Sequence, residues 1–272
     1  NDTFTVGDGS NISDGDTLSG GDGTDTFDVG DNSLDARTSG DVGDATVSGI
    51  DRILANNGGA DTINVDDEFV SQSDDDEVTV QIEDENTDGT DDADITVDAQ
   101  VSEGNTVILS GVDTDTDFDD NLDDFFFTLS NNGDNRVTLA DDPDGDGNTG
   151  AGETGVRLTA GSNADTITGG ASDDLVDITN GGDDTIDLGG GDDTFVVGDG
   201  SAISDGDTLT GGSGNDTFAA GDNNLDLSTK LGDATVTGID EISVSNNGNN
   251  TVTVNDAFVE QSDSGEVTVS VT

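Results

Sequence analysis

Residues 160–196 read AGSNADTITGGASDDLVDITNGGDDTIDLGGGDDTFV, and this stretch decides the fold. Its apolar residues recur at intervals of nine, from Ile167 to Val176 and from Ile186 to Phe195. Gly and Asp fill the intervals, and glycine permits the positive-φ backbone that tight turns need. A nine-residue apolar period separated by Gly/Asp turns is typical of a parallel β-roll, in which short strands cover a thin core.

The same rhythm belongs to a much longer repeat. Residues 2–34 read DTFTVGDGSNISDGDTLSGGDGTDTFDVGDNSL, and residues 193–225 read DTFVVGDGSAISDGDTLTGGSGNDTFAAGDNNL, an offset of 191. After a two-residue deletion the match continues at an offset of 189 up to Thr272, whose counterpart is Glu83. We interpret the chain as one whole repeat of about 191 residues and the opening of the next, cut from a tandem array of the kind that builds fibres, stalks and surface coats.

Four segments follow from this repeat. We assign 1–82 to the first part of repeat 1, 83–159 to a central β region, 160–191 to the nonapeptide β-roll that completes repeat 1, and 192–272 to the start of repeat 2. Outside the nonapeptides, runs such as EVTVQI at 77–82 alternate apolar and polar residues, as half-buried strands do. The expected fold is therefore all-β, with parallel β-roll or β-solenoid segments joined to sandwich-like or solenoid strands.

The composition indicates that cations accompany the folded chain. There are 64 acidic residues against 5 basic ones, for a formal charge of −59, and no His or Cys. Such charge opposes a compact body unless it is neutralised, and oxygen-only ligands favour Ca²⁺ over zinc or copper. It also excludes nucleic acid and anionic membrane surfaces as partners, and no apolar run reaches the length of a transmembrane helix. A halophile's acidic surface is an additional explanation that does not exclude calcium.

Two stretches fit the pattern G-G-x-G-x-D-x-U-x without a mismatch, GGDGTDTFD at 20–28 and GGSGNDTFA at 211–219. They resemble the calcium-binding nonapeptides of the RTX (hemolysin-type) family, found in secreted bacterial adhesins and S-layer proteins. The resemblance implies a right-handed parallel β-roll in which Asp carboxylates and loop carbonyls hold Ca²⁺ between turns. On this resemblance the metal ligands are Asp16, Asp25, Asp165, Asp174, Asp184, Asp193, Asp207 and Asp216. The interval of fourteen between Phe195 and Leu209 predicts an irregular roll.

A second kind of calcium loop is predicted at Asp142–Glu153, which reads DPDGDGNTGAGE and fits D-x-[DN]-x-[DN]-G-x₅-E. Side chains at positions 1, 3 and 5 converge on one ion, Gly at 6 makes the bend, position 7 donates a carbonyl and Glu at 12 donates two oxygens. The loop resembles that of the EF-hand family over twelve residues only, because its flanks are strand-like. Its expected ligands are Asp142, Asp144, Asp146, Asn148 and Glu153.

Three other segments leave alternatives open. The acidic runs 84–94 and 113–124 lack fixed spacing, so each is either a solvated charge run or a loose calcium site. The triplet Phe125-Phe126-Phe127 cannot face one core in a strand, since alternate side chains point to opposite faces. The triplet is therefore either buried between layers of the domain or in contact with a neighbouring subunit.

The sequence favours a structural role over a catalytic one. His and Cys are absent, and Arg52 is replaced by Glu241 in the second copy, so we expect no enzyme; a polysaccharide-cleaving β-helix is the catalytic alternative. Ice binding would need the same side chain at one loop position in successive turns. Position five instead runs Ala164, Asp173, Asp183, Asp192, Gly206 and Asn215.

We therefore expect a secreted, calcium-binding repeat protein that forms an extracellular filament, surface layer or matrix fibre. Extracellular placement follows from calcium, because weak sites fill outside a cell and stay mostly empty inside it. The alternative within the structural class is the stalk of a large RTX adhesin. The expected partners are identical chains, with cell-surface or glycan contact as a further possibility.

Replacing Glu153 with Gln is expected to weaken one calcium site, because the loop loses a charged bidentate ligand. Calcium titration by calorimetry on the wild type and on Glu153→Gln measures the difference. Superimposable isotherms would show that Asp142–Glu153 is only an acidic turn.

Overall fold

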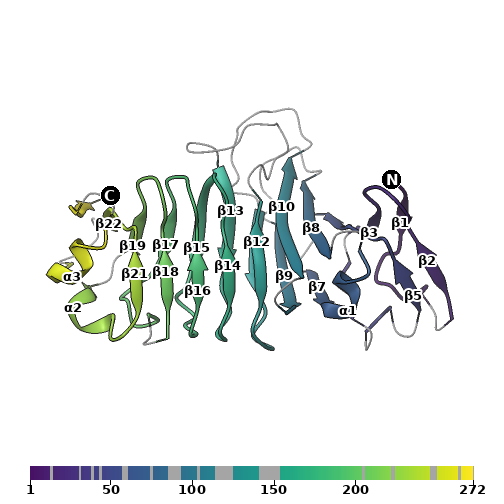
Figure 1. Cartoon of the computed structure of the whole chain (residues 1–272), viewed down its shortest axis with the longest axis horizontal. Coiled ribbons are helices and arrows are strands. Elements are labelled where there is room, and N and C mark those ends of the chain that lie inside the picture. The colour runs from purple at the N-terminus through teal and green to yellow at the C-terminus, as the bar shows by residue number, and fades with distance from the viewer. Residues whose placement is uncertain are drawn as a thin grey trace.

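The structure is a computed structural model, and its strands lie side by side along one long axis, with the two termini at opposite ends (Figure 1). The residues that the structure describes are 1–12, 15–30, 32–37, 40–42, 45–56, 61–73, 76–84, 93–102, 105–113, 125–140, 154–203, 206–221, 224–245, 250–262 and 265–271.

Two parallel sheets, here called sheet A and sheet C, each contain ten strands within the described residues. Sheet A consists, in order, of β1 (Thr3–Thr5), β3 (Thr26–Gly30), β6 (Arg52–Asn56), β8 (Glu77–Asp84), β10 (Thr106–Asp113), β12 (Arg136–Leu139), β14 (Thr166–Thr168), β16 (Thr185–Asp187), β18 (Thr208–Thr210) and β21 (Thr235–Thr237). Sheet C consists of β4 (Leu34–Asp35), β7 (Asp61–Asp66), β9 (Ala93–Gln100), β11 (Phe125–Leu129), β13 (Thr154–Thr159), β15 (Asp173–Asp177), β17 (Thr194–Val196), β19 (Thr217–Gly221), β22 (Glu241–Val244) and β24 (Thr268–Val271).

Short elements accompany these sheets near the two ends. Sheet B pairs β2 (Thr17–Ser19) with β5 (Thr46–Ser48), and sheet E pairs β20 (Leu225–Asp226) with β23 (Val252–Thr253). The described helices are single turns: α1 (Asp67–Val70), α2 (Leu227–Lys230) and α3 (Asp256–Val259).

The chain winds as a β-solenoid, which confirms the predicted fold class. From β8 to β19 it alternates between sheets A and C, so each coil contributes one strand to each sheet. Ile167 lies opposite Ile186 and Val176 opposite Phe195, so these coils contain nineteen residues, about two nonapeptides. Phe195 lies opposite Phe218, a coil of twenty-three. The longer interval after Phe195 therefore widens the coil without breaking the stack.

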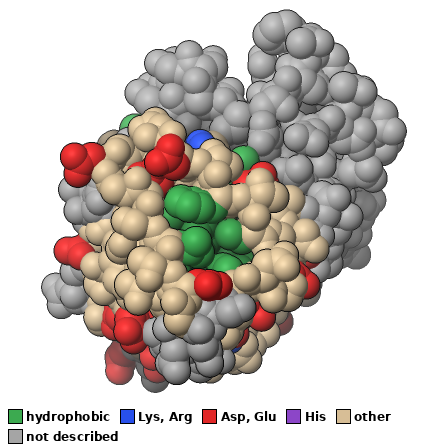
Figure 2. All heavy atoms as spheres, turned by 90° about the vertical axis from the view of Figure 1, so that its right-hand side faces the viewer, with side chains coloured by type: hydrophobic (Ala, Val, Ile, Leu, Met, Phe, Trp, Pro, Cys, Tyr) green, Lys and Arg blue, Asp and Glu red, His purple; other side chains and the backbone are tan. Residues whose placement is uncertain are grey.

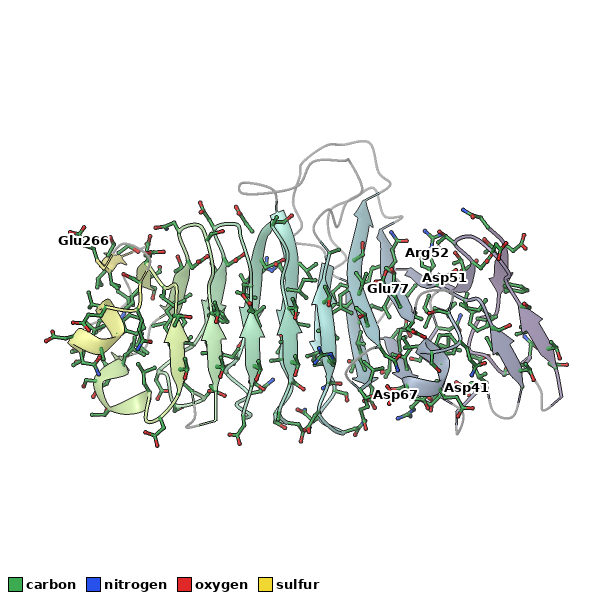
Figure 3. All side chains as sticks on the ribbon, viewed as in Figure 1. Asp41, Asp51, Arg52, Asp67, Glu77 and Glu266 are labelled. Atoms are coloured by element: carbon green, nitrogen blue, oxygen red, sulfur yellow. The ribbon has the colours of Figure 1, made fainter. Side chains whose placement is uncertain are left out.

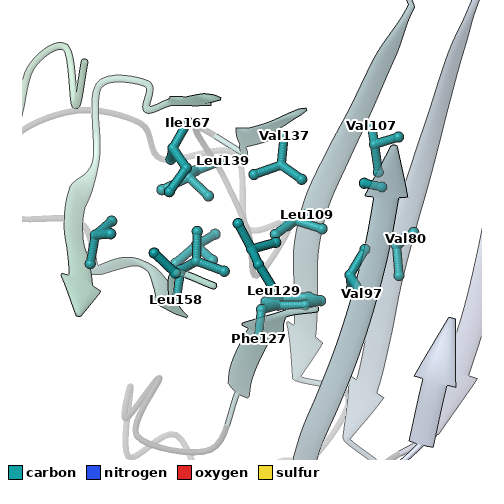
Figure 4. Close-up of a cluster of buried hydrophobic side chains, with 14 of the residues drawn as sticks. Val80, Val97, Val107, Leu109, Phe127, Leu129, Val137, Leu139, Leu158 and Ile167 are labelled. Carbon is teal, nitrogen blue, oxygen red and sulfur yellow. The ribbon is translucent and has the colours of Figure 1, made fainter. Parts of the chain in front are cut away.

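A single apolar core fills the space between sheets A and C. Figure 4 shows part of it, where valine, leucine and isoleucine side chains from both sheets lie together with Phe127. Phe127 is 1% exposed, so one member of the phenylalanine triplet is buried inside the domain. The side chains of Phe125 and Phe126 lie outside the described residues. At nearly every coil, stacked side chains exclude water, and this burial is the main favourable term in folding.

The two sequence copies build the same local core. In the first copy the ring of Phe27 lies 6.1 Å from Phe4 and 6.0 Å from Phe69, which belongs to α1. In the second copy Phe218 lies 5.7 Å from Phe195 and 5.9 Å from Phe258, which belongs to α3. Each of these helices begins at a side chain that accepts a hydrogen bond from the phenylalanine N–H, Asp66 in α1 and Asn255 in α3. This N-terminal capping therefore positions Phe69 over the core in the first copy and Phe258 in the second.

Equivalent strands of the two copies nevertheless lie in different sheets. Strands β1, β3, β6 and β8 belong to sheet A, whereas their counterparts β17, β19, β22 and β24 belong to sheet C. Likewise β2 and β5 form sheet B, whereas their counterparts β18 and β21 belong to sheet A. The repeat therefore does not contain a whole number of coils, and the second copy is turned about the long axis by one sheet.

Truncation of Phe195 is expected to destabilise the protein by about 3–5 kcal/mol, the usual cost of removing a buried aromatic ring. The matched variant is Phe4→Ala at the equivalent position of the first copy. Phe4 is only half-buried because no coil precedes it within the described residues, so its loss should be smaller. Urea unfolding followed by circular dichroism measures the free energy of unfolding of both variants. An equal loss of stability in Phe195→Ala and Phe4→Ala would contradict this account of the core.

Candidate functional site

Buried aspartates form two rows along the solenoid, one on each large sheet. Each aspartate lies at the start of a strand and is followed closely by the apolar residue that enters the core. Row A contains Asp165, Asp184 and Asp207, and row C contains Asp174, Asp193 and Asp216. All six are at most 3% exposed. Six of the eight aspartates predicted from the nonapeptide pattern are therefore brought into two lines, because successive units alternate between the sheets.

Hydrogen bonds between coils hold row C together. The backbone N–H of Asp174 donates to Oδ1 of Asp193 at 2.7 Å, and the N–H of Asp193 donates to Oδ1 of Asp216 at 2.9 Å. The carbonyl of Asp193 in turn accepts the N–H of Thr217 at 2.8 Å. Each aspartate thus satisfies a backbone donor of the preceding coil with its side chain. An intramolecular hydrogen bond contributes about 0.5–1.5 kcal/mol, so the repeated bonds of the row add to the stability of coil stacking.

Row A repeats this arrangement and ends in an asparagine. The N–H of Asp165 donates to Oδ1 of Asp184 at 2.9 Å, and that of Asp184 donates to Oδ1 of Asp207 at 2.8 Å. Asn135 stands next in the row, and both its N–H and its Nδ2 donate to Oδ1 of Asp165 at 2.9 Å. The nonapeptide pattern does not include this member. The signal was present, because NRVTL at Asn135 matches the DTIT that follows in the next coil.

The first copy carries a similar row on sheet A, in which Asp25 directly precedes β3 and Asp51 directly precedes β6. Asp25 is fully buried, and its N–H donates to Oδ2 of Asp51 at 2.9 Å. Its own carboxylate accepts the N–H of Asp2. Asp51 was also missed by the nonapeptide pattern, although Asp240 occupies the matching position in the second copy. Asp16, which was predicted to be a ligand, is exposed in the N-terminal coil.

Burial makes the carboxylates of Asp193 and Asp184 costly to ionise. It raises the pKa of Asp193 to about 8, and the neighbouring carboxylates of Asp174 and Asp216 add to the effect. Burial likewise raises the pKa of Asp184 to about 7. Oδ2 of Asp193 and Oδ2 of Asp25 are buried and accept no hydrogen bond from the described residues. At neutral pH Oδ2 of Asp193 needs either a proton or a cation, since an uncompensated buried charge is strongly unfavourable.

Calcium fits this chemistry in part. Carboxylate oxygens are its preferred ligands, and the unsatisfied Oδ2 atoms are of that type. However, no group of three or more acidic side chains within the described ranges is close enough to enclose an ion. An ion between coils would therefore have to combine one or two row carboxylates with backbone carbonyls, which Ca²⁺ accepts.

The predicted loop ligands Asp142, Asp144, Asp146, Asn148 and Glu153 lie outside the described residues, and so do most residues of both acidic runs.

Two arginines have structural contacts. Arg52 on β6 donates from Nε to Oγ1 of Thr26 at 3.0 Å and from Nη1 to Oε1 of Gln81 at 2.9 Å, and so links three neighbouring strands of sheet A (Figure 3). Arg37 lies 2.7 Å from Asp35 and 3.2 Å from the fully buried Asp98. These guanidinium groups join coils to one another, as the aspartate rows do.

No family model matches this chain, and no curated protein or solved structure matches it either. The resemblance to the RTX family therefore stays a prediction from the nonapeptide residues.

Without divalent cations, the free energy of unfolding is expected to fall as the pH rises from 3.8 to about 8. The pKa of Asp184 and Asp193 in the folded state lies above the ordinary value of 3.8, so the folded state binds protons more tightly in this window. That advantage is complete below the unfolded pKa and is lost as the pH rises through the folded pKa. Urea titrations at a series of pH values measure the slope.

Two asparagine variants separate the buried row from the general charge. Asp193→Asn keeps an oxygen that can accept the N–H of Asp174 but removes one titrating group, so the slope should become shallower. Asp187→Asn removes one carboxylate from an exposed position on β16 and should leave the slope nearly unchanged. If Asp193→Asn retained the wild-type slope, the buried row would not be the source of the pH dependence.

Proposed function

We propose that this protein is a secreted, calcium-stabilised structural solenoid of an extracellular filament, surface layer or matrix fibre. The observation that carries the proposal is the join between the two sequence copies. The first strands of the second copy, β17 and β18, pair directly with β15 and β16 of the first copy. A further repeat therefore lengthens one continuous body and does not add a separate domain, which is how repeat proteins make long, stiff objects.

The charge of the chain supports a role for calcium. Five basic residues face 64 acidic ones, and several carboxylates are buried in rows between coils. Neutralising them would remove like-charge repulsion from the coil stack, because adjacent row members lie in successive coils. Extracellular calcium is the cation that we propose, at several sites. The loop Asp142–Glu153 would supply a further site of its own.

A non-catalytic role fits the same contacts. Row carboxylates accept hydrogen bonds between coils, and the described arginine contacts link strands. No helix in the described part of the chain is long and apolar enough to cross a lipid bilayer. We propose identical chains as the main partner. The stalk of an adhesin, with a cell-surface or glycan ligand elsewhere, is the alternative, and assembly of the purified chain on addition of Ca²⁺ distinguishes a filament from a passive spacer.

Removal of divalent cations with EDTA at low salt is expected to unfold much of the solenoid. The chain has a formal net charge of −59, and the repulsion among its carboxylates is then neither neutralised nor screened. Circular dichroism should show loss of β signal and its return when Ca²⁺ is added. An equimolar addition of Na⁺ is the control and should restore little. A spectrum that EDTA leaves unchanged at neutral pH would refute the calcium role.

A further inference from the structure

Outward-facing threonines of sheet A form two rows, here called the threonine face. Strands β14, β16, β18 and β21 read TIT, TID, TLT and TVT, and in each the central apolar residue is buried while both flanking residues face outward. The parallel register places these flanking residues opposite one another on successive strands. One row is Thr166, Thr185, Thr208 and Thr235, and the other is Thr168, Asp187, Thr210 and Thr237.

The two rows are positions seven and nine of the nonapeptide, whereas position five forms no uniform row. Successive nonapeptides alternate between the sheets, so the rows are present only in the folded solenoid. Threonine has a general preference for strands, but this preference does not explain why the uniform rows lie on sheet A. The same positions on sheet C run Leu175, Thr194, Thr217 and Glu241 in one row and Asp177, Val196, Ala219 and Ser243 in the other.

The first copy also has hydroxyl side chains at the positions that match β18 and β21. Its strands β2 and β5, which pair in parallel in sheet B, read TLS and TVS. In both copies the pair at position nine is hydrogen-bonded. Oγ of Ser48 donates to Oγ of Ser19 at 3.2 Å, and Oγ1 of Thr237 donates to Oγ1 of Thr210 at 3.3 Å. The repeat therefore keeps the hydroxyl group at each of these positions even where serine replaces threonine.

The threonine face carries little charge, although the chain has 64 acidic residues. Figure 2 views the solenoid from its N-terminal side and shows acidic side chains around its periphery. Within the two rows Asp187 is the one acidic residue, and Arg136 lies opposite Thr166 at the edge of the face. A charged ligand would gain little there, whereas a neutral ligand can exchange hydrogen bonds with the hydroxyl groups, which both donate and accept.

The geometry of the face is periodic in two directions. Neighbouring strands of a sheet lie about 4.7–4.9 Å apart, and residues i and i+2 of one parallel strand lie about 6.6 Å apart. Threonine is restricted at χ1 because it is β-branched, so its hydroxyl and methyl groups are held in few positions. The strands also run in nearly the same direction (Figure 1), which keeps the rows aligned. Such an array is suited to a ligand that is itself periodic.

Ice is a neutral ligand with a matching period. Each of its oxygens is tetrahedrally bonded to its neighbours at the usual O–H···O distance of about 2.75 Å, so two oxygens that share a neighbour lie about 4.5 Å apart. This distance is within about 0.4 Å of the spacing between strands. The threonine hydroxyls can therefore occupy places equivalent to water oxygens along each row.

We propose that the threonine face binds the surface of ice. This activity goes beyond the structural role proposed above, and it does not depend on which cation stabilises the solenoid. It requires only that the coils are stacked, because the rows belong to the folded sheet.

Ice growth in a nanolitre osmometer tests the proposal, with the whole chain folded in Ca²⁺-containing buffer. The wild type should shape ice crystals and hold the freezing temperature below the melting temperature, a gap called thermal hysteresis. Thr208→Tyr should remove most of this gap, because the ring holds the ice surface away from the neighbouring rows. Thr24→Tyr, at an exposed turn position outside the face, is the matched control and should keep the wild-type gap.

Asp187→Thr provides a test in the opposite direction. It completes the second row and removes the charge from the face, so the thermal hysteresis should increase. A folding defect cannot produce this gain. Circular dichroism of each variant should match that of the wild type, and Thr185→Tyr on the neighbouring strand replaces Thr208→Tyr if the latter does not fold.

Two results in the osmometer would overturn the proposal: a folded wild type that neither shapes ice nor shows hysteresis, or a folded Thr208→Tyr variant with the full wild-type gap. Sedimentation velocity distinguishes ice from a second copy of the chain as the ligand of this face. If the wild type self-associates, Thr208→Tyr abolishes that association, and hysteresis is absent, the face is a contact between chains and the ice proposal is wrong.

Discussion

The hydrogen bond from an aspartate N–H to the carboxylate of the next coil is the interaction on which the solenoid depends. It forms at the start of a strand, where the backbone N–H of the aspartate donates to a carboxylate and not to a carbonyl of the neighbouring parallel strand. A buried donor must be satisfied, and a side chain from the adjacent coil does this only if the coils are in register. The glycines nearby permit the required approach. At Gly191, with φ of +126°, an added Cβ would collide with the carbonyl oxygen of Ser172.

The same bond places negative charge where water is scarce. Coil stacking and carboxylate charge are therefore coupled. Alignment of the coils brings carboxylates of successive coils together, and neutralisation of those carboxylates favours the aligned state. A proton can perform this task, and under the proposed calcium role a divalent cation would compete with it. The carboxylate of Asp165 accepts three hydrogen bonds, whereas Oδ2 of Asp193 has no donor among the described residues. Sensitivity to pH and to cations thus differs from one coil to the next.

Much of this arrangement was predictable from the sequence, and the remainder has physical reasons. The nine-residue spacing of Ile167 and Val176 predicted parallel strands, because a one-sided core requires one apolar residue per strand. It did not identify Asn135 or Asp51 as row members, since they lie in coils whose loops depart from the nonapeptide pattern. Nor did the offset of 191 indicate that equivalent strands occupy different sheets. Residue counts fix the length of a repeat, whereas the number of coils depends on loop lengths that only the folded chain reveals.

The turn by one sheet between copies has a geometric consequence. Translation along the axis is combined with rotation about it, so the two copies are related by a screw operation. Any side group borne by the repeat, such as the exposed face of α1 or of α3, then points in a new direction at each copy. An array of such repeats would present its groups along a helical path.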